Sequence, residues 1–159
     1  MKNKKFKLIP ERQCGDCQAC CEGWLHGNVH GELMYPGKPC HFIEDKGCSI
    51  YNDRPENPCK SYKCLWLEDA SVPGHFKPNL IGTILTRKKI EDIEFIEASE
   101  AGKKIDATLL TWLFFSDKNF LYTINYNAYW WGSDQFNQTM KEFIKNGHNN
   151  LGAVSTALD

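Results

Sequence analysis

The sequence CGDCQACC at residues 14 to 21 is the part of the chain best equipped to do chemistry. Four of its eight residues are cysteines, and four more cysteines follow before residue 65. The eight are Cys14, Cys17, Cys20, Cys21, Cys40, Cys48, Cys59 and Cys64. Two cysteines separated by two residues can turn both sulfurs toward one ion, as in zinc and iron–sulfur sites. Because this spacing occurs twice in overlap, Cys14, Cys17 and Cys20 are expected to face one metal ion.

The adjacent pair Cys20 and Cys21 is expected to play two different roles, since neighbouring side chains diverge. A disulfide between the two would be strained, because adjacent Cα atoms lie ~3.8 Å apart and a disulfide usually spans ~4.4–6.8 Å. Cys21 would then serve a second site or stay outside the first. Eight thiolates match two sites of four thiolates each, and a bridged centre with several metal ions would also use them.

The spacing alone does not choose between zinc and iron. A C-x2-C-x2-C run opens the bacterial ferredoxin signature, which then continues with C-x3-C-P. Here Cys21 follows Cys20 at once, and proline precedes cysteine at Pro39-Cys40 and Pro58-Cys59. Soft thiolates favour zinc or an iron–sulfur centre over magnesium or calcium. Zinc and iron, the latter in an iron–sulfur cluster, therefore both stay open as cofactors.

The cysteines also stand in a longer order of motifs. After the CxxCxxCC run come PCHF at 39–42, GCSIYNDRP at 47–55 and CKSYKC at 59–64. Over about residues 13 to 66, this order resembles the YkgJ-type cysteine-cluster family, described as a zinc- or iron-chelating CxxCxxCC domain. The segment 65–85 resembles the region after the cysteines in short members of this family. The resemblance implies that all eight cysteines are metal ligands, and it implies no reaction.

Other side chains near the cysteines could assist them. His26, His30 and His41 could each complete a metal shell through nitrogen, with His41 the best placed in sequence. Arg54, in YNDRP, could offset the negative charge of a thiolate cluster, or could organise a turn ahead of Pro55. Acid–base candidates such as Asp16 occur, but no spacing singles out a pair of carboxylates.

Composition limits the partners of the protein. The chain has 159 residues and a net charge of −1, so nothing global favours nucleic acid or an anionic membrane. It shows neither a secretory signal at its start nor an apolar run of ~20 residues that would span a membrane. We therefore expect a cytosolic location, where thiols stay reduced and bind metal rather than form disulfides.

The distribution of cysteines and turn formers predicts one α+β domain over residues 1–159. Residues 13–66 should form a loop-rich metal-binding region, because glycine and proline are frequent there. Residues 75–147 should form a supporting region: a small antiparallel sheet with two helices, followed by a polar tail at 148–159. The expected elements are strands at 80–86, 92–98, 120–126 and 129–131, and helices at 105–115 and 135–146. The expected turns are at Arg87–Lys89 and Asn127–Ala128, with a cap at Ser133 or Asp134.

Aromatic residues near the end of this region have two interpretations. Tyr122, Tyr126, Tyr129, Trp130 and Trp131 could stack nucleobases, or could fill a core or an interface. Little basic charge lies among them, which favours packing and argues against nucleic acid as a partner.

Three classes of function compete. The first is a metal-binding protein whose cysteine region wraps a zinc or iron–sulfur centre, with the α+β region supporting it or presenting it to a protein partner. The second is an iron- or iron–sulfur-dependent enzyme for redox or group-transfer chemistry. The third is a nucleic-acid-binding zinc module. An open coordination position beside a pocket would favour the enzyme.

Overall fold

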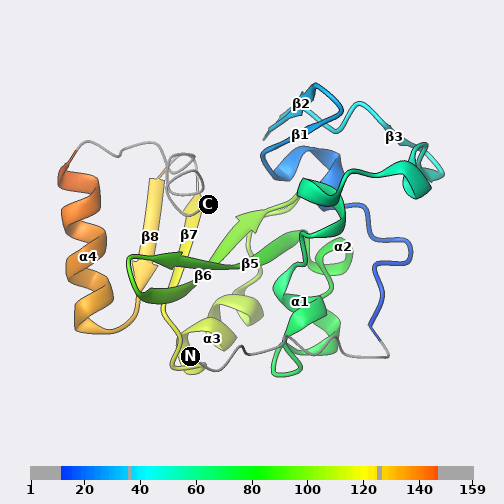
Figure 1. The fold of residues 1–159 in the computed structure, drawn as a ribbon. Coiled ribbons are helices and arrows are strands. Elements are labelled where there is room, and N and C mark those ends of the chain that lie inside the picture. Colours follow the sequence, from blue (N-terminus) through cyan, green and yellow to red (C-terminus); the bar gives the residue numbers. More distant parts are fainter. Residues whose placement is uncertain (1–11, 36, 125–126, 147–159) are drawn as a thin grey trace, which may run out of the picture. The chain divides into compact units, whose positions relative to one another are not determined.

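A computed structural model describes residues 12–35, 37–124 and 127–146. The chain divides into two compact units, Met1–Ile81 and Gly82–Asp159, with the elements labelled in Figure 1. We call the first the cysteine unit and the second the sheet unit, and we describe each by itself. The α+β class predicted from the sequence is confirmed. Tyr126 and the polar tail expected at 148–159 lie outside the described residues.

The cysteine unit consists of short elements joined by turns. Its strands are β1 (Gly27–Val29), β2 (Glu32–Met34), β3 (Ile43–Glu44) and β4 (Gly47–Cys48). Its helices are α1 (Leu65–Glu68) and α2 (Pro78–Ile81), and further helical turns lie at Cys20–Trp24, Tyr51–Asp53, Glu56–Lys60 and Gly74–Phe76. The strands form two separate antiparallel hairpins, β1 with β2 and β3 with β4. The glycines and prolines of this region keep every element short, as the sequence predicts.

Gly23 shows why one of these glycines is required. Its φ of +92° lies in the left-handed region, which residues with a side chain rarely adopt. A Cβ at this position would also lie 2.9 Å from the backbone nitrogen of Pro39. Glycine therefore lets the turn after Cys21 approach the segment that leads into Cys40.

Arg12 holds the two ends of the cysteine-bearing segment together. Its guanidinium donates hydrogen bonds to the carbonyl oxygens of Trp66 at 2.7 Å, Asp69 at 3.2 Å and Val72 at 2.6 Å. Its Cζ atom also lies 5.0 Å from the centre of the Trp66 ring. Since Arg12 precedes the first cysteine by two positions and Trp66 follows the last by two, these contacts bring the start and the end of the segment to one place.

The sheet unit is built on one four-stranded sheet in the order β5–β6–β7–β8. Its elements are β5 (Thr83–Ile90), β6 (Ile93–Glu100), α3 (Ala107–Phe115), β7 (Phe120–Ile124), β8 (Asn127–Trp131) and α4 (Asp134–Lys145). The hairpins β5–β6 and β7–β8 are antiparallel. Strands β6 and β7 run parallel, because α3 carries the chain back across the sheet between them, so this sheet is mixed and not antiparallel throughout as expected.

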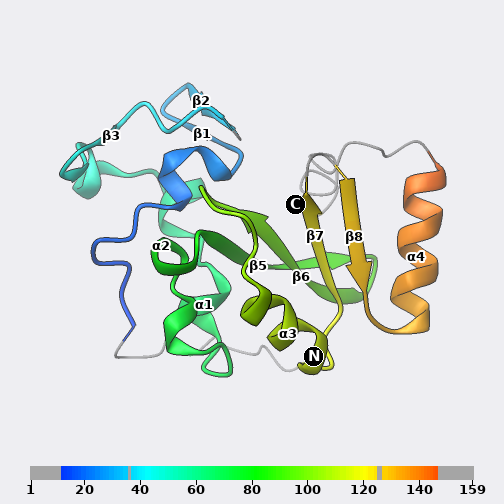
Figure 2. The same cartoon turned by 180° about the vertical axis from the view of Figure 1, so that it is seen from behind.

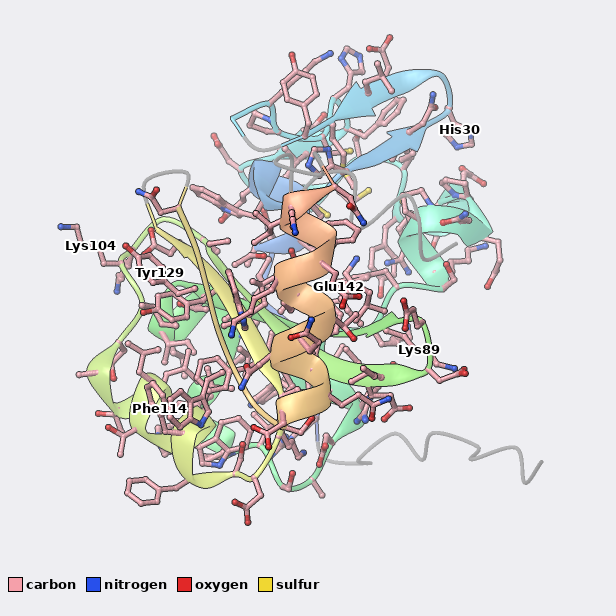
Figure 3. The ribbon with its side chains drawn as sticks, turned by 90° about the vertical axis from the view of Figure 1, so that its left-hand side faces the viewer. His30, Lys89, Lys104, Phe114, Tyr129 and Glu142 are labelled. Atoms are coloured by element: carbon pink, nitrogen blue, oxygen red, sulfur yellow. The ribbon has the colours of Figure 1, made fainter. Side chains whose placement is uncertain are left out.

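The two helices of this unit cover opposite faces of the sheet. Neighbouring residues of a strand point to opposite faces of the sheet, so Phe120 and Leu121 of β7 lie on different faces. Phe120 meets Phe114 of α3 at 5.0 Å between ring centres, whereas Leu121 packs with Phe136 and Met140 of α4. Figure 2 shows α3 in front, and Figure 3 shows α4 in front, with Phe114 beyond β7 and β8.

Two turns lie elsewhere than the sequence analysis expected. The turn between β5 and β6 is at Glu91–Asp92, where Glu91 has a φ of 54°, and not at Arg87–Lys89. The charged residues continue the strand because Lys88 pairs with Glu97 at 3.8 Å and Arg87 with Glu94 at 3.6 Å.

Two further strand ends are also corrected. Leu80 belongs to α2 and not to the first long strand, which begins at Thr83 after Gly82, at a φ of +65°. Asn127 and Ala128 lie in β8 and pair with Ile124 and Thr123, so the expected turn at these two residues is wrong.

Local signals in the helices are confirmed. The Ser133 hydroxyl accepts a hydrogen bond from the backbone N–H of Phe136 at 3.2 Å and so caps α4, which begins one residue before its expected start. The Asp106 side chain caps α3 in the same way, through the N–H of Thr108. Among the described residues, no helix has the length and apolar character needed to cross a membrane.

Candidate metal centre

All eight cysteines are free thiols, and all belong to the cysteine unit. Cys40 and Cys64 are buried, Cys14 is exposed, and the other five are half-buried. Buried thiols are ordinary core residues when they are alone, but here they lie among other thiols. The neighbours of each thiol therefore decide which chemistry it can share.

Cys20 and Cys21 point the same way, so the expected divergence of these neighbours is wrong. Their sulfur atoms lie 3.8 Å apart, at the start of the helical turn Cys20–Trp24. One thiol can donate a hydrogen bond to the other. This contact lowers the pKa of Cys21 to about 7, with burial opposing the shift and the Arg54 guanidinium adding to it. The same contact, together with burial, raises the pKa of Cys20.

Two thiols from the start of the segment, Cys14 and Cys17, lie near Cys64 at its end. Burial and then the thiolates of Cys14 and Cys17 raise the pKa of Cys64, which shows that these sulfurs are electrostatic neighbours. Cys14 and Cys17 also raise the pKa of Cys20, after its contact with Cys21 and its burial. The backbone N–H of Cys17 donates to the carbonyl of Cys14 at 2.8 Å, which closes a tight turn. We call Cys14, Cys17, Cys20 and Cys64 the first thiol group.

The remaining thiols lie around the apolar centre of the cysteine unit. Buried Cys40 packs with Val29 and Met34, and Cys21 and Cys59 contact this cluster from its edge. The N–H of Cys40 donates to the carbonyl of Cys21 at 2.9 Å. Burial and then the thiolates of Cys21, Cys40 and Cys48 raise the pKa of Cys59. We call Cys21, Cys40, Cys48 and Cys59 the second thiol group.

Each thiol group has its own cationic neighbours. Burial and the Cys17 thiolate raise the pKa of Cys14, and Lys63 and Lys77 oppose this shift. Lys77 also pairs with the exposed carboxylate of Asp16 at 2.8 Å, so Asp16 has a structural partner in place of an acid–base one. The contact with Cys20 lowers the pKa of Cys21, and Arg54 adds to this shift. Burial raises the pKa of Cys59, and Arg54 opposes this shift.

The sequence indicated Arg54 and missed the lysines. Arg54 also organises its turn, as the alternative interpretation held, since it donates to the carbonyl of Tyr51 at 2.8 Å. Lys63 stands beside Cys64 in the sequence and could have been noticed there. Lys77 lies far from Cys14 along the chain, so only the fold brings the two together.

The three candidate histidines are all exposed, and His30 and His41 make contacts with groups other than the thiols. His30, at the end of the β1–β2 hairpin in Figure 3, makes a hydrogen bond of 3.0 Å with the carbonyl of Asp53. His41 meets the Phe42 ring edge to face at 5.1 Å. The chemistry of the site therefore rests on sulfur.

The thiol groups do not form a closed metal site in this structure. Within 12–35, 37–124 and 127–146, no three or more His, Cys, Asp or Glu side chains are arranged so that they could hold a metal ion. Cys20 and Cys21 make a direct sulfur–sulfur contact. The donor set fits a soft or borderline metal ion by its chemistry, and binding would require the other sulfurs to close in.

The aromatic residues of the sheet unit divide between packing and exposure. Trp130 packs against the core beneath α4, and Tyr122 stacks on Tyr129 at 5.2 Å between ring centres. Tyr129 and Trp131 keep 47% and 57% of their surface exposed. Packing therefore explains part of this set.

Comparisons of the chain with protein-family models, with curated proteins and with solved structures found no match.

Proposed function

We propose that this protein binds metal through its eight cysteines and that the metal is zinc or the iron of an iron–sulfur centre. The resemblance to the cysteine-cluster family implies this set of ligands. The observation that carries the proposal is the placement of all eight free thiols in the cysteine unit, where the sulfurs of Cys20 and Cys21 are in contact and Cys21 and Cys59 pack against the cluster that contains Cys40. The first thiol group joins Cys64 to Cys14, Cys17 and Cys20, and the second joins Cys21 to three later cysteines. Four thiolates are a full shell for a tetrahedral zinc ion and for the iron–sulfur clusters.

The chain connectivity supports this proposal. A buried thiol that served only as a small apolar residue would need no other thiol beside it. Here the sulfurs of Cys20 and Cys21 are in contact, Cys21 and Cys59 pack against the cluster that contains Cys40, and the contacts of Arg12 hold the ends of the segment together. Such convergence is what a metal with several protein ligands requires.

Charge supports the proposal as well. Four thiolates around a divalent ion leave two excess negative charges, which are costly in a partly buried site. Lys63 and Lys77 beside the first thiol group and Arg54 beside the second would offset part of this charge. The proposal includes a cytosolic location, because reduced thiols persist there.

The test is anaerobic purification of the full chain, followed by elemental analysis for zinc, iron and acid-labile sulfide and by an absorption spectrum. We expect zinc alone, or iron with sulfide and visible charge-transfer bands. Replacing Cys40 and Cys59 together by serine should remove metal, whereas replacing Ser49 and Ser61 by alanine should leave the content unchanged. A folded, metal-free chain that takes up neither metal under reducing conditions would refute the proposal.

A second candidate is an iron- or iron–sulfur-dependent enzyme, favoured by the exposure of Cys14 in the first thiol group. An exposed ligand is one that a substrate could displace, and an open position is what distinguishes catalytic from structural metal sites. A Cys14→Ser variant that keeps its metal and gains a water-sensitive spectrum would support this candidate. Loss of the metal in that variant would favour the purely structural role.

A further inference from the structure

The sheet unit carries a row of aromatic rings on one face of its sheet. Trp131 of β8 meets Phe114 of α3 at 5.5 Å between ring centres, and Phe114 meets Phe120 of β7 at 5.0 Å. Phe120 lies 6.4 Å from Tyr122, which stacks on Tyr129 of β8 at 5.2 Å. The register of the two strands explains this row, since Phe120 pairs with Trp131 and Tyr122 with Tyr129. We call these five residues the aromatic face.

The inner and outer rings of the aromatic face differ in exposure. Phe120 is 0% exposed and Tyr122 is half-buried, whereas the exposed fractions of Phe114, Tyr129 and Trp131 are 46%, 47% and 57%. Figure 3 shows Phe114 and Tyr129 on the side of β7 and β8 that lies away from α4, so this helix does not cover them. Single exposed apolar side chains are common, but rings in mutual contact form a continuous patch, which is typical of a binding surface.

The two elements that present the exposed rings carry no charge. The sequence of α3 is ATLLTWLFF and that of β8 is NAYWW, and neither contains an acidic or basic residue. A partner recognised by its charge, such as a nucleic acid or an anionic lipid surface, would find no group on these elements to pair with. The aromatic face therefore suits an uncharged, apolar surface.

Strand β8 is also an edge of the four-stranded sheet. Among the described strands, it pairs with β7 on one side and with no strand on the other. Natural proteins protect such edges from pairing with charged residues or proline. The opposite edge strand, β5, has this protection in Arg87, Lys88 and Lys89, whereas β8 contains neither charge nor proline. The edge of β8 is therefore suited to pairing with another strand.

A second copy of β8 matches this edge. Two copies related by a two-fold axis at Tyr129 would pair antiparallel, with Tyr129 opposite its own copy and Trp131 opposite Asn127. Such pairing brings like residues together, so a charged strand would repel its copy, and the uncharged β8 would not. Because side chains alternate along a strand, the rings of both copies would lie on the same face of the joined sheet.

We propose that the protein forms a two-fold dimer through the aromatic face and the edge of β8. Half-exposed aromatic rings offer about 100 Å² each, so the three exposed rings contribute roughly 300 Å² per copy besides the contact between strands. A standard interface buries ~800 Å² per partner, so this dimer is weak and reversible. The inference uses no thiol, and its test is therefore independent of metal binding.

The test is sedimentation equilibrium of the reduced full chain between about 1 µM and about 1 mM, the range in which a weak dimer dissociates. We expect the average mass to rise from that of one chain toward that of two. The amides of residues 127–131 should exchange several-fold more slowly in the concentrated sample than in the dilute one. A chain that stays monomeric over the whole range would overturn the inference.

Substitutions at Tyr129 test the two-fold axis. Tyr129→Lys and Tyr129→Glu each place like charges opposite one another, and each should raise the Kd about tenfold or more. An equimolar mixture of the two variants should dimerise again, because opposite charges then meet. Leu33→Lys is the matched control, since Leu33 is 54% exposed in the cysteine unit, and it should leave the Kd unchanged. Circular dichroism checks that each variant keeps its fold.

Other results would assign the aromatic face differently. A mixture of the two Tyr129 variants that stays monomeric, or an equal loss of association in Leu33→Lys, would overturn the two-fold pairing. Sedimentation of a monomeric chain with vesicles of neutral phosphatidylcholine would assign the face to a lipid surface in place of a second copy. A dimer of a chain that binds neither zinc nor iron would support this inference and refute only the proposed function.

Discussion

The cysteine unit and the sheet unit fill their interiors in different ways. The sheet unit buries Ile90, Phe95, Leu121, Phe136 and Met140 in one cluster between its sheet and α4. The corresponding cluster of the cysteine unit has three buried members, Val29, Met34 and Cys40, and one of them is a thiol. Hydrogen-bonded strands of five to eight residues support the first cluster, and strands of two or three residues support the second.

The difference shows which unit can fold by apolar burial alone. Ordering a residue costs ~1–2 kcal/mol, and long strands and helices offset this cost with buried side chains and paired backbone groups. The segment 14–64 of the cysteine unit has little of either. Its buried hydrophobic residues are Ala19, Val29, Met34, Cys40 and Cys64, and two of these five are thiols. On our proposal, metal–thiolate bonds replace the missing core.

The largest effect should come from metal removal. Treating the reduced protein with a strong chelator should expose the amides of residues 14–64 to fast hydrogen exchange and to protease, while residues 83–145 keep their protection. Structural zinc supplies ~10–16 kcal/mol of apparent binding free energy, so its loss should unfold the cysteine unit. Mass spectrometry of exchanged peptides measures both units in one experiment. Unchanged protection in residues 14–64 would mean that metal is not the core of this unit.

A core substitution in the sheet unit should give the converse result. Phe136 is 0% exposed, and Phe136→Ala should lower the free energy of unfolding by ~3–5 kcal/mol through the cavity that it leaves. The metal content of the chain should stay the same. Phe115, which is 83% exposed, supplies the control, since Phe115→Ala should change stability by about 0.5 kcal/mol or less. Equal losses in denaturant titrations of the two variants would contradict the described core.

A pair of glycines tests the backbone of the cysteine unit. Gly23→Ala should destabilise this unit by roughly 2–4 kcal/mol, since it adds left-handed strain and a contact with the Pro39 backbone. Gly31 has a similar φ of +89° but open space around it, so Gly31→Ala should cost only about 1 kcal/mol. The zinc affinity of each variant, measured by competition with a coloured chelator, reports how far the substitution destabilises the cysteine unit. A larger loss for Gly31→Ala than for Gly23→Ala would contradict this reasoning.

The smallest effect concerns a helix cap in the sheet unit. Ser133→Ala removes the hydroxyl that accepts from Phe136 and should cost about 1 kcal/mol. Ser133→Asp keeps an acceptor beside the helix N-terminus and should retain the stability. Thermal unfolding followed by circular dichroism measures both variants. The cap stabilises only its own unit, so metal affinity should be unaffected in either variant.

The features that the sequence predicted well are those set by neighbours in the chain. Ser133 and the buried face of Phe136 and Met140 lie within two turns of one helix, so periodicity and capping chemistry were enough. The turn at Arg87–Lys89 was wrong because charge suggested exposure, whereas these residues pair with Glu94 and Glu97 on the next strand. Cross-strand partners are not visible in a single segment.

The candidate site shows the same limit. Spacing predicts that the eight cysteines carry the chemistry, and all eight lie in one unit. Spacing did not show that Cys64 lies near Cys14, or that Cys20 and Cys21 converge. The proximity of Cys64 to Cys14 depends on contacts between segments that are distant in the chain. The convergence of Cys20 and Cys21 depends on a helical turn, where the rule that neighbouring side chains diverge does not hold.

The contacts of Arg12 can form only after all eight cysteines have been synthesised. A chain made from its N-terminus has already produced all eight cysteines before Asp69 and Val72, whose carbonyls Arg12 needs, have been added. Every thiol therefore leaves the ribosome before the ends of the segment can be fastened. On our proposal, the thiols are therefore accessible to a metal ion before the Arg12 contacts close the segment.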